Sequence, residues 1–157
     1  MNWIREEFTF HDLQRLLFKL AERVKVFRGL TPAEISELLA HAEKCTFRAG
    51  APIVSEGSVG SHMYLIINGD AVVTKHGRGG DVELARLGST DSFGEMALVD
   101  NASRSATVKA IGDCVLVRIG DNAFETTPEI GMKIYRNMAR VMSERLRDAD
   151  EQLAWRL

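Results

Sequence analysis

The sequence predicts a mainly β domain, an antiparallel jelly roll or barrel with flanking helices. Eleven of the thirteen glycines lie between Gly50 and Gly120. That stretch contains roughly eight short apolar runs at even spacing, which end in turn residues. Among them, Asn68-Gly69-Asp70 predicts a hairpin between the strands on either side of it. The chain on either side has helical periodicity instead. Because the strands do not alternate with helices, a parallel α/β sheet is disfavoured.

Two helices are expected before the roll. The first has apolar residues three and four positions apart, namely Leu13, Leu16, Leu17, Leu20 and Val24. Thr31-Pro32-Ala33-Glu34 then forms a capping-box pattern with proline in the first turn, which predicts the start of the second helix.

A long helix is expected after the roll. Thr127 can cap it, Pro128 suits its first position and Glu129 favours its dipole. Its apolar stripe consists of Ile134, Met138, Val141, Met142, Leu146, Ala149 and Leu153. The stretch from Arg145 to Glu151 is charged and is expected to be solvated. The chain is therefore interpreted as one domain over 1–157, with N-terminal helices in 1–45, the roll in 46–120 and the C-terminal helix in 121–157.

Composition excludes several classes of protein. The 157 residues carry a formal charge of −2. The chain therefore lacks the excess of basic residues that is typical of proteins that wrap nucleic acid. Cys45 and Cys114 are too few and too far apart for a disulfide scaffold, a zinc ribbon or an iron–sulfur cluster. The N-terminus is charged where a signal peptide is apolar, and no run approaches the ~20 apolar residues of a membrane span. A soluble, cytoplasmic protein with reduced thiols is expected.

The sequence offers little support for catalysis. Its four histidines do not stand at metal-ligand spacing, so no metal site is expected. Gly77-Arg78-Gly79-Gly80 lies between strands and predicts a hairpin turn rather than a nucleotide loop. No serine or cysteine has a nucleophile-elbow pattern, and Cys114 is expected to be a small core residue. We expect a protein that is not an enzyme.

One segment, from 91 to 108, interrupts the strand pattern. Gly94-Glu95 is unfavourable in a strand, and a short helical turn over 95–98 fits better. The first N–H groups of a helix are unpaired and attract anions, and Gly94 lets a ligand approach the backbone. Arg104 can hold a phosphate through two parallel hydrogen bonds, and the Glu95 carboxylate can accept from a sugar hydroxyl. The alternative is a surface Glu–Arg ion pair worth ~0–1 kcal/mol.

The order of these residues resembles a known family. Phe-Gly-Glu-Met-Ala-Leu at 93–98, followed by Arg-Ser-Ala-Thr-Val at 104–108, is similar to the phosphate-binding cassette of cyclic nucleotide-binding domains. These domains occur in bacterial catabolite activator proteins, in regulatory subunits of cAMP-dependent protein kinase and in cyclic nucleotide-gated channels. Upstream positions agree in order, including Gly50, Glu56-Gly57, Gly60 and Gly69. The resemblance extends over about 27–146 and implies the jelly roll of that family.

The resemblance implies a role for each cassette residue. Glu95 would bind the ribose 2′-hydroxyl and Arg104 the oxygens of the cyclic phosphate. The N–H groups of Ala97 and Ser105, with the Ser105 hydroxyl, would complete the phosphate cage. The implied ligand-binding set is Phe93, Gly94, Glu95, Met96, Ala97, Arg104, Ser105 and Ala106. Met96 is also expected to pack beneath the cassette of 93–107, and no cofactor or metal is implied.

The resemblance implies that the C-terminal helix supplies a lid over the base of the ligand. Two departures from the family pattern concern this lid and the loop before Arg104. Ser103 stands where the family usually has proline before the arginine. The stretch 124–128 is short, so the residue that caps the base cannot be aligned. Tyr135, Arg140 and Arg145 are the candidates, and for each the alternative is a solvated or packed helix residue.

The predicted function is a cyclic nucleotide sensor, either stand-alone or part of a longer protein, whose C-terminal helix moves when ligand binds. The resemblance favours cAMP over cGMP, although Ser105 fits either ligand. A homodimer through Met138, Met142 and Ala149 is a further possibility, and the signal would pass to an effector protein because no DNA-binding domain is visible. No direct binding of nucleic acid is expected. The alternative is an interaction module that has kept the fold and lost its ligand.

Overall fold

The computed structural model describes residues 9–156, so the expectations for 1–8 and 157 lie outside it. The chain begins with helix α2 (Phe10–Arg23), a 3₁₀ turn η1 (Lys25–Phe27) and helix α3 (Pro32–Leu39). The capping box of α3 is confirmed. The Glu34 N–H donates to Thr31 Oγ1 at 3.2 Å, and the Thr31 N–H donates to Glu34 Oε2 at 2.8 Å.

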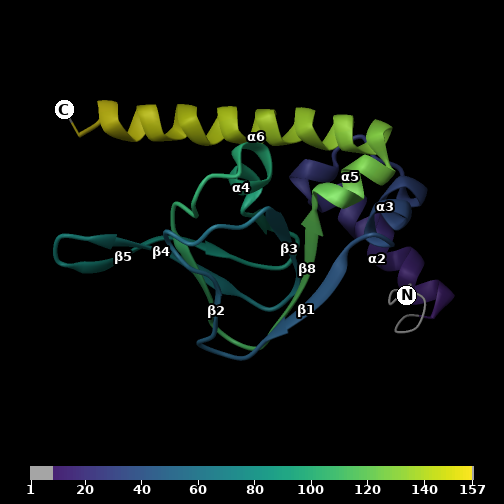
Figure 1. Ribbon diagram of the computed structural model, residues 1–157, viewed down its shortest axis with the longest axis horizontal. Coiled ribbons are helices and arrows are strands. Elements are labelled where there is room, and N and C mark those ends of the chain that lie inside the picture. The colour runs from purple at the N-terminus through teal and green to yellow at the C-terminus, as the bar shows by residue number, and fades with distance from the viewer. Residues whose placement is uncertain (1–8, 157) are drawn as a thin grey trace.

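Eight strands follow in the described part of the chain, and they form two four-stranded antiparallel sheets. One sheet has the order β1-β8-β3-β6 and the other β2-β7-β4-β5. The predicted jelly-roll class is confirmed, with α2 and α3 at one end of the roll and the long C-terminal helix along its length (Figure 1). The strands are β1 (Glu43–Phe47), β2 (Pro52–Val54), β3 (His62–Asn68), β4 (Ala71–Gly77), β5 (Gly80–Leu87), β6 (Ser92–Phe93), β7 (Thr107–Ala110) and β8 (Cys114–Gly120).

Strand β3 serves two hydrophobic cores, which explains its continuous apolar sequence. Successive side chains of a strand point to opposite faces. Met63 and Leu65 pack with the helices, whereas Tyr64 and Ile66 pack between the two sheets. Cys114 is buried in the core between the sheets, as expected. Strand β1 starts at Glu43, before the boundary expected after residue 45, because residues 43–47 pair with β8.

The roll ends in a short helix, α5 (Asp121–Thr126), followed by the long helix α6 (Pro128–Ala154). Pro128 stands in the first turn of α6 as expected, but Thr127 does not cap it. Its hydroxyl instead donates to the carbonyl of Ala123 at 2.7 Å, because α5 ends directly before α6 and leaves that carbonyl within reach.

The two halves of α6 have different surroundings. Ile130, Ile134, Met138 and Val141 are buried against the helical core. From residue 143 to 156 every residue is exposed, and this end of the helix extends in the same direction as the β4–β5 hairpin (Figure 1). None of the helices in 9–156 is long and apolar enough to span a bilayer.

Asn137 ties the buried half of α6 to the N-terminal helices. Its side chain is buried, and Nδ2 donates to the carbonyls of Val26 at 2.9 Å and Arg28 at 2.7 Å. A buried amide that satisfies two main-chain acceptors fixes the position of both segments. Helix α6 and the segment around η1 are therefore held as one unit.

Candidate functional site

The expected helical turn is present as helix α4 (Glu95–Asp100), and left-handed residues stand at both of its ends. Gly94 precedes it with φ +78°, and Asn101 follows with φ +52°. A Cβ atom on Gly94 would lie 2.6 Å from Arg104 Nη1. The missing side chain therefore makes room for the guanidinium as well as permitting the turn.

Arg104 is buried and is held by main-chain oxygens. Only 7% of it is exposed. Nη2 donates to the carbonyl of His62 at 2.9 Å, and Nη1 donates to the carbonyl of Gly94 at 3.2 Å. Burial lowers the pKa of Arg104 from its usual value, while the interaction with Tyr64 opposes this shift. The guanidinium carbon lies 5.8 Å from the centre of the Tyr64 ring, within cation–π range.

Glu95 is also buried, with 3% of it exposed, and its two carboxylate oxygens have different partners. The Ser92 hydroxyl donates to Oε1 at 2.7 Å. Arg145 of α6 brings Nη1 to 3.5 Å from Oε2. The surface Glu–Arg pair considered from spacing alone is wrong, because both side chains are buried. Among the described residues Glu95 pairs with Arg145, and no ion pair joins it to Arg104.

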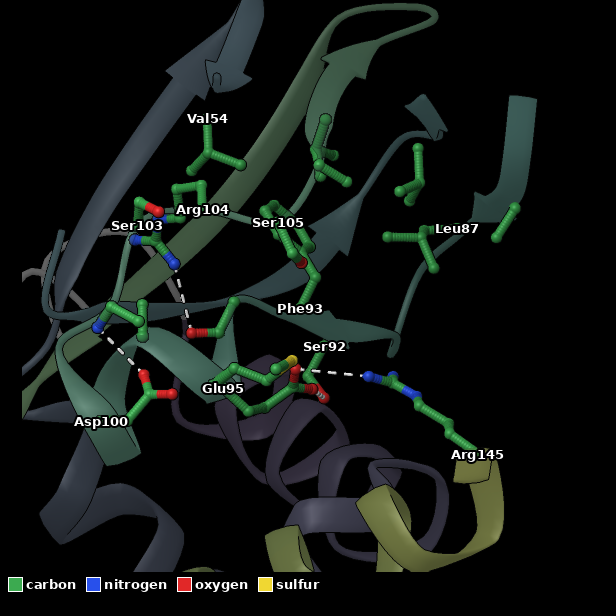
Figure 2. A pocket seen from close by; sticks show the side chains of 18 residues that line it. Val54, Leu87, Ser92, Phe93, Glu95, Asp100, Ser103, Arg104, Ser105 and Arg145 are labelled. Atoms are coloured by element: carbon green, nitrogen blue, oxygen red, sulfur yellow. Dashed lines mark hydrogen bonds and ion pairs between the residues drawn. The ribbon is translucent and has the colours of Figure 1, made fainter. Parts of the chain in front are cut away.

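A cavity of about 360 Å³ lies between these two groups (Figure 2). This volume falls within the range of small-molecule sites. All the cassette residues singled out from the sequence line it, namely Phe93, Gly94, Glu95, Met96, Ala97, Arg104, Ser105 and Ala106. Met96 is half exposed, which contradicts the expectation that it packs beneath the cassette. It stands on the open side of a one-and-a-half-turn helix whose buried side is occupied by Ala97 and Leu98.

The opposite wall of the cavity is apolar and was not predicted. It consists of residues from four strands, including Val54, Val73, Leu87 and Val108. In the sequence, each is an ordinary apolar strand residue with no motif that marks it. They meet at one cavity because β2, β7, β4 and β5 are neighbours in a single sheet. The site thus combines two buried charges with an apolar surface.

The three lid candidates lie in different places. Arg145 lines the cavity, where its guanidinium points toward Glu95 (Figure 2). Tyr135 packs on Phe124 with ring centres 5.3 Å apart, and burial raises the pKa of its hydroxyl. Arg140 lies beside Lys25 and Arg28, at a separate depression. Within 9–156 no group of three or more histidine, cysteine or carboxylate side chains could hold a metal ion.

The sequence agrees with a family model described as "Cyclic nucleotide-binding domain" over residues 44–128. The chain belongs to this family. The matched segment contains both sheets of the cyclic nucleotide-binding domain and the whole cassette, and it ends at the first residue of α6.

Similar proteins and structures agree with this assignment. The chain is 31% identical over 129 residues to the cyclic AMP receptor protein of Thermus thermophilus, covering 82% of this chain and 60% of that protein. It is 34% identical over 118 residues to the regulatory subunit of a cAMP-dependent protein kinase of Mycosarcoma maydis, covering 70% of this chain and 22% of that subunit. The chain thus spans less than two thirds of each of these relatives.

The solved structures agree in fold. The catabolite activator protein of Thermus thermophilus aligns with a TM-score of 0.77 at 30% identity, over 83% of this chain and 62% of that one. The regulatory domain of Toxoplasma gondii PKA, solved with cAMP, aligns with a TM-score of 0.71 at 25% identity, over 85% of this chain and 51% of that one.

Proposed function

We propose that this chain is a cyclic nucleotide sensor that binds cAMP in the cavity between Glu95 and Arg104. The observation that carries the proposal is the pair of oppositely charged side chains, both buried at one cavity and not joined to each other. Burying a charged group costs free energy even when it has hydrogen-bond partners, so such groups are typical of functional sites. A ligand with one negative charge and free hydroxyls complements both.

The orientation of the ligand follows from the chemistry of the two ends. Arg104 would bind the cyclic phosphate, because its fixed guanidinium can add charge-assisted hydrogen bonds to anionic oxygens. The Ser105 hydroxyl and the N–H groups of Ala97 and Ser105 would complete this phosphate site. Glu95 would accept from the ribose 2′-hydroxyl. The apolar wall opposite would take the base, and the relatives named for cAMP support cAMP over cGMP.

The output of binding would be a movement of α6. Arg145 lines the cavity and contacts the same carboxylate that would bind ribose. A 2′-hydroxyl at Oε2 would displace this guanidinium and free it to turn toward the base. The ligand would thereby favour one position of α6 over another, which is a population shift. An effector protein would read this change.

Calorimetric titration with cAMP, cGMP and 5′-AMP tests the proposal. We expect saturable binding of cAMP, weaker binding of cGMP and none of the non-cyclic 5′-AMP. Thermal unfolding gives an independent measure, since ligand at 100 times its dissociation constant adds ~2.7 kcal/mol of stability. Absence of binding and of any thermal shift at millimolar cAMP and cGMP would refute the sensor and favour the interaction module.

We also propose that α6 mediates a homodimer along its outward side. This stripe has a heptad pattern in which Met132, Ala139, Leu146 and Leu153 are seven positions apart, with Tyr135, Met142 and Ala149 three positions after the first three. Leu146 and Leu153 are exposed in the single chain. Met138, expected in this seam, is only 1% exposed and packs in the core of its own chain, so it is not available to a partner.

Analytical ultracentrifugation tests the dimer. We expect the wild type to sediment as a dimer and the Leu146→Glu, Leu153→Glu double variant as a monomer. Glu151→Lys is the matched control, because it changes a charge on the same helix away from the stripe and should leave the dimer intact. A monomeric wild type at about 100 µM, well above typical dissociation constants of stable dimers, would contradict the proposal.

A further inference from the structure

Ser92 is a buried residue of the cavity that sequence reasoning did not single out. It is 9% exposed, and its hydroxyl donates to Glu95 Oε1 at 2.7 Å. This hydrogen bond joins two buried side chains at the end of the cavity opposite Arg104 (Figure 2). A hydroxyl that donates to a buried carboxylate forms one of the stronger classes of hydrogen bond.

The position of Ser92 is fixed by the sheet. Strand β6 pairs with β3, with Ser92 opposite Leu65 and Phe93 opposite Tyr64. The Ile66 N–H donates to the carbonyl of Asp91 at 2.9 Å, immediately before Ser92. The donor to Oε1 is therefore held by main-chain hydrogen bonds within the roll.

The donor to the other carboxylate oxygen is held less firmly. Arg145 belongs to α6, its side chain is 57% exposed, and Nη1 lies 3.5 Å from Oε2. A long contact made by a largely exposed arginine side chain holds its partner only weakly. The two oxygens of Glu95 thus differ, because Oε1 has a short bond to a fixed donor and Oε2 has a long bond to an exchangeable one.

We infer that Ser92 is a positioning residue that sets the selectivity of the site for ribose over 2′-deoxyribose. By holding Oε1, it fixes the rotation of the Glu95 carboxylate and leaves Oε2 as the acceptor for the 2′-hydroxyl. This inference rests on the proposed binding of cAMP. It assigns to Ser92 no contact with the ligand itself.

The test compares cAMP with 2′-deoxy-cAMP, which lacks the hydroxyl that Glu95 would bind. The wild type should prefer cAMP. Ser92→Ala should lower the affinity for cAMP about tenfold, or ~1.4 kcal/mol, and change that for 2′-deoxy-cAMP less than about twofold. Ser92→Thr, which keeps the hydroxyl, should retain the preference of the wild type.

Two further variants separate positioning from a general structural effect. In a Glu95→Ala background, Ser92→Ala should have no additional effect, because the two residues act through one interaction. Ser89→Ala is the matched control, since this hydroxyl in the preceding turn donates to the carbonyl of Ile67 and not to Glu95. It should leave the preference for cAMP unchanged.

The outcomes are distinguishable. Equal weakening of both nucleotides by Ser92→Ala, or no change with either, would overturn the inference while cAMP binding itself stands. If the wild type binds neither nucleotide, the proposed function fails, and the inference fails with it.

Discussion

The two ends of the cavity hold their charges by different means. Arg104 is fixed by the main-chain carbonyls of His62 and Gly94, whereas Glu95 is fixed by the side chains of Ser92 and Arg145. Main-chain acceptors persist through almost any substitution at their own positions, and here they belong to the rigid roll. The arginine end is therefore pre-organised, while the glutamate end can respond to a change in α6. In the proposed sensor, the arginine end would capture the ligand and the glutamate end would transmit the signal to α6.

The largest effect is expected at the arginine end. Arg104→Ala should weaken cAMP binding about 100-fold, or ~2.7 kcal/mol, because the charge-assisted bonds to the phosphate are lost. The fold should survive, since removing a buried charge also removes the cost of its desolvation. Calorimetric titration and thermal unfolding measure the two quantities.

Arg78→Ala is the control for this variant, because Arg78 is an exposed arginine in the β4–β5 turn. It should bind cAMP as the wild type does. An unchanged affinity in Arg104→Ala would show that the arginine is not the anchor for the ligand.

A substitution at Gly94 should disturb the same end without removing the charge. In Gly94→Ala the backbone must keep φ near +78° with a Cβ atom 2.6 Å from Arg104 Nη1. We expect a loss of about 1–3 kcal/mol in the free energy of unfolding, measured by urea denaturation, from backbone strain and displacement of the guanidinium. The affinity for cAMP should fall about tenfold, an order-of-magnitude figure for one disturbed hydrogen-bonded charge.

Gly79→Ala gives the matched comparison, because no atom lies within 4 Å of its added Cβ. It should change neither stability nor affinity by more than a few tenths of a kcal/mol, about the scatter of surface substitutions. Equal behaviour of the two alanine variants would argue against a tight fit at Gly94.

A substitution of Arg145, at the glutamate end, should affect the response of α6 to the ligand more than the affinity for cAMP. Arg145→Ala should change the affinity for cAMP by at most about fivefold, because the Arg145 side chain is more than half exposed and lies 3.5 Å from Glu95. Amide hydrogen exchange of residues 142–154 should no longer differ between the free and the cAMP-bound protein. Among the described residues of α6, Arg145 alone lines the cavity. A ligand-dependent change that persists in Arg145→Ala would mean that another contact carries the signal.

The smallest effect concerns pH. Burial, with a further contribution from Arg118, lowers the pKa of His62, whose carbonyl holds Arg104. Below about pH 6.5 the unfolded chain therefore binds more protons at this residue than the folded one. The free energy of unfolding should fall as the pH drops through this range and should not depend on His62 above it. Urea denaturation between pH 5 and 7.5 tests this, and an unchanged slope in His62→Gln would contradict it.

The features that were predictable are those encoded in a few consecutive residues. The capping box at Thr31, the β4–β5 hairpin turn at 77–80 and the helical turn after Gly94 each depend on local backbone chemistry. The hairpin indicated by Asn68-Gly69-Asp70 is absent, because β3 and β4 belong to different sheets. The cassette could likewise be located because its residues stand within 93–107. Short-range signals of this kind need no knowledge of how the sheets assemble.

The features that were missed depend on packing between distant segments. Val73 and Leu87 reach the cavity only through the pairing of β4 with β5 and β7. Ser92 gains its role from the position of Glu95 on α4. Met138 has the spacing of a seam residue, but the helix buries that side against its own chain. A single sequence shows which face of a helix is apolar, but not which partner covers it.

The link made by Asn137 has a thermodynamic consequence. Asn137 holds α6 and the segment at 26–28 as one unit. In the proposed sensor, a macromolecule that bound the N-terminal helices would therefore change the affinity of the cavity for cAMP through α6. Linkage is reciprocal, so any factor by which cAMP changed the affinity for such a macromolecule would be the factor by which that macromolecule changed the affinity for cAMP. Under the proposed function, a ligand in the cavity and a macromolecule at the N-terminal helices would thus regulate each other.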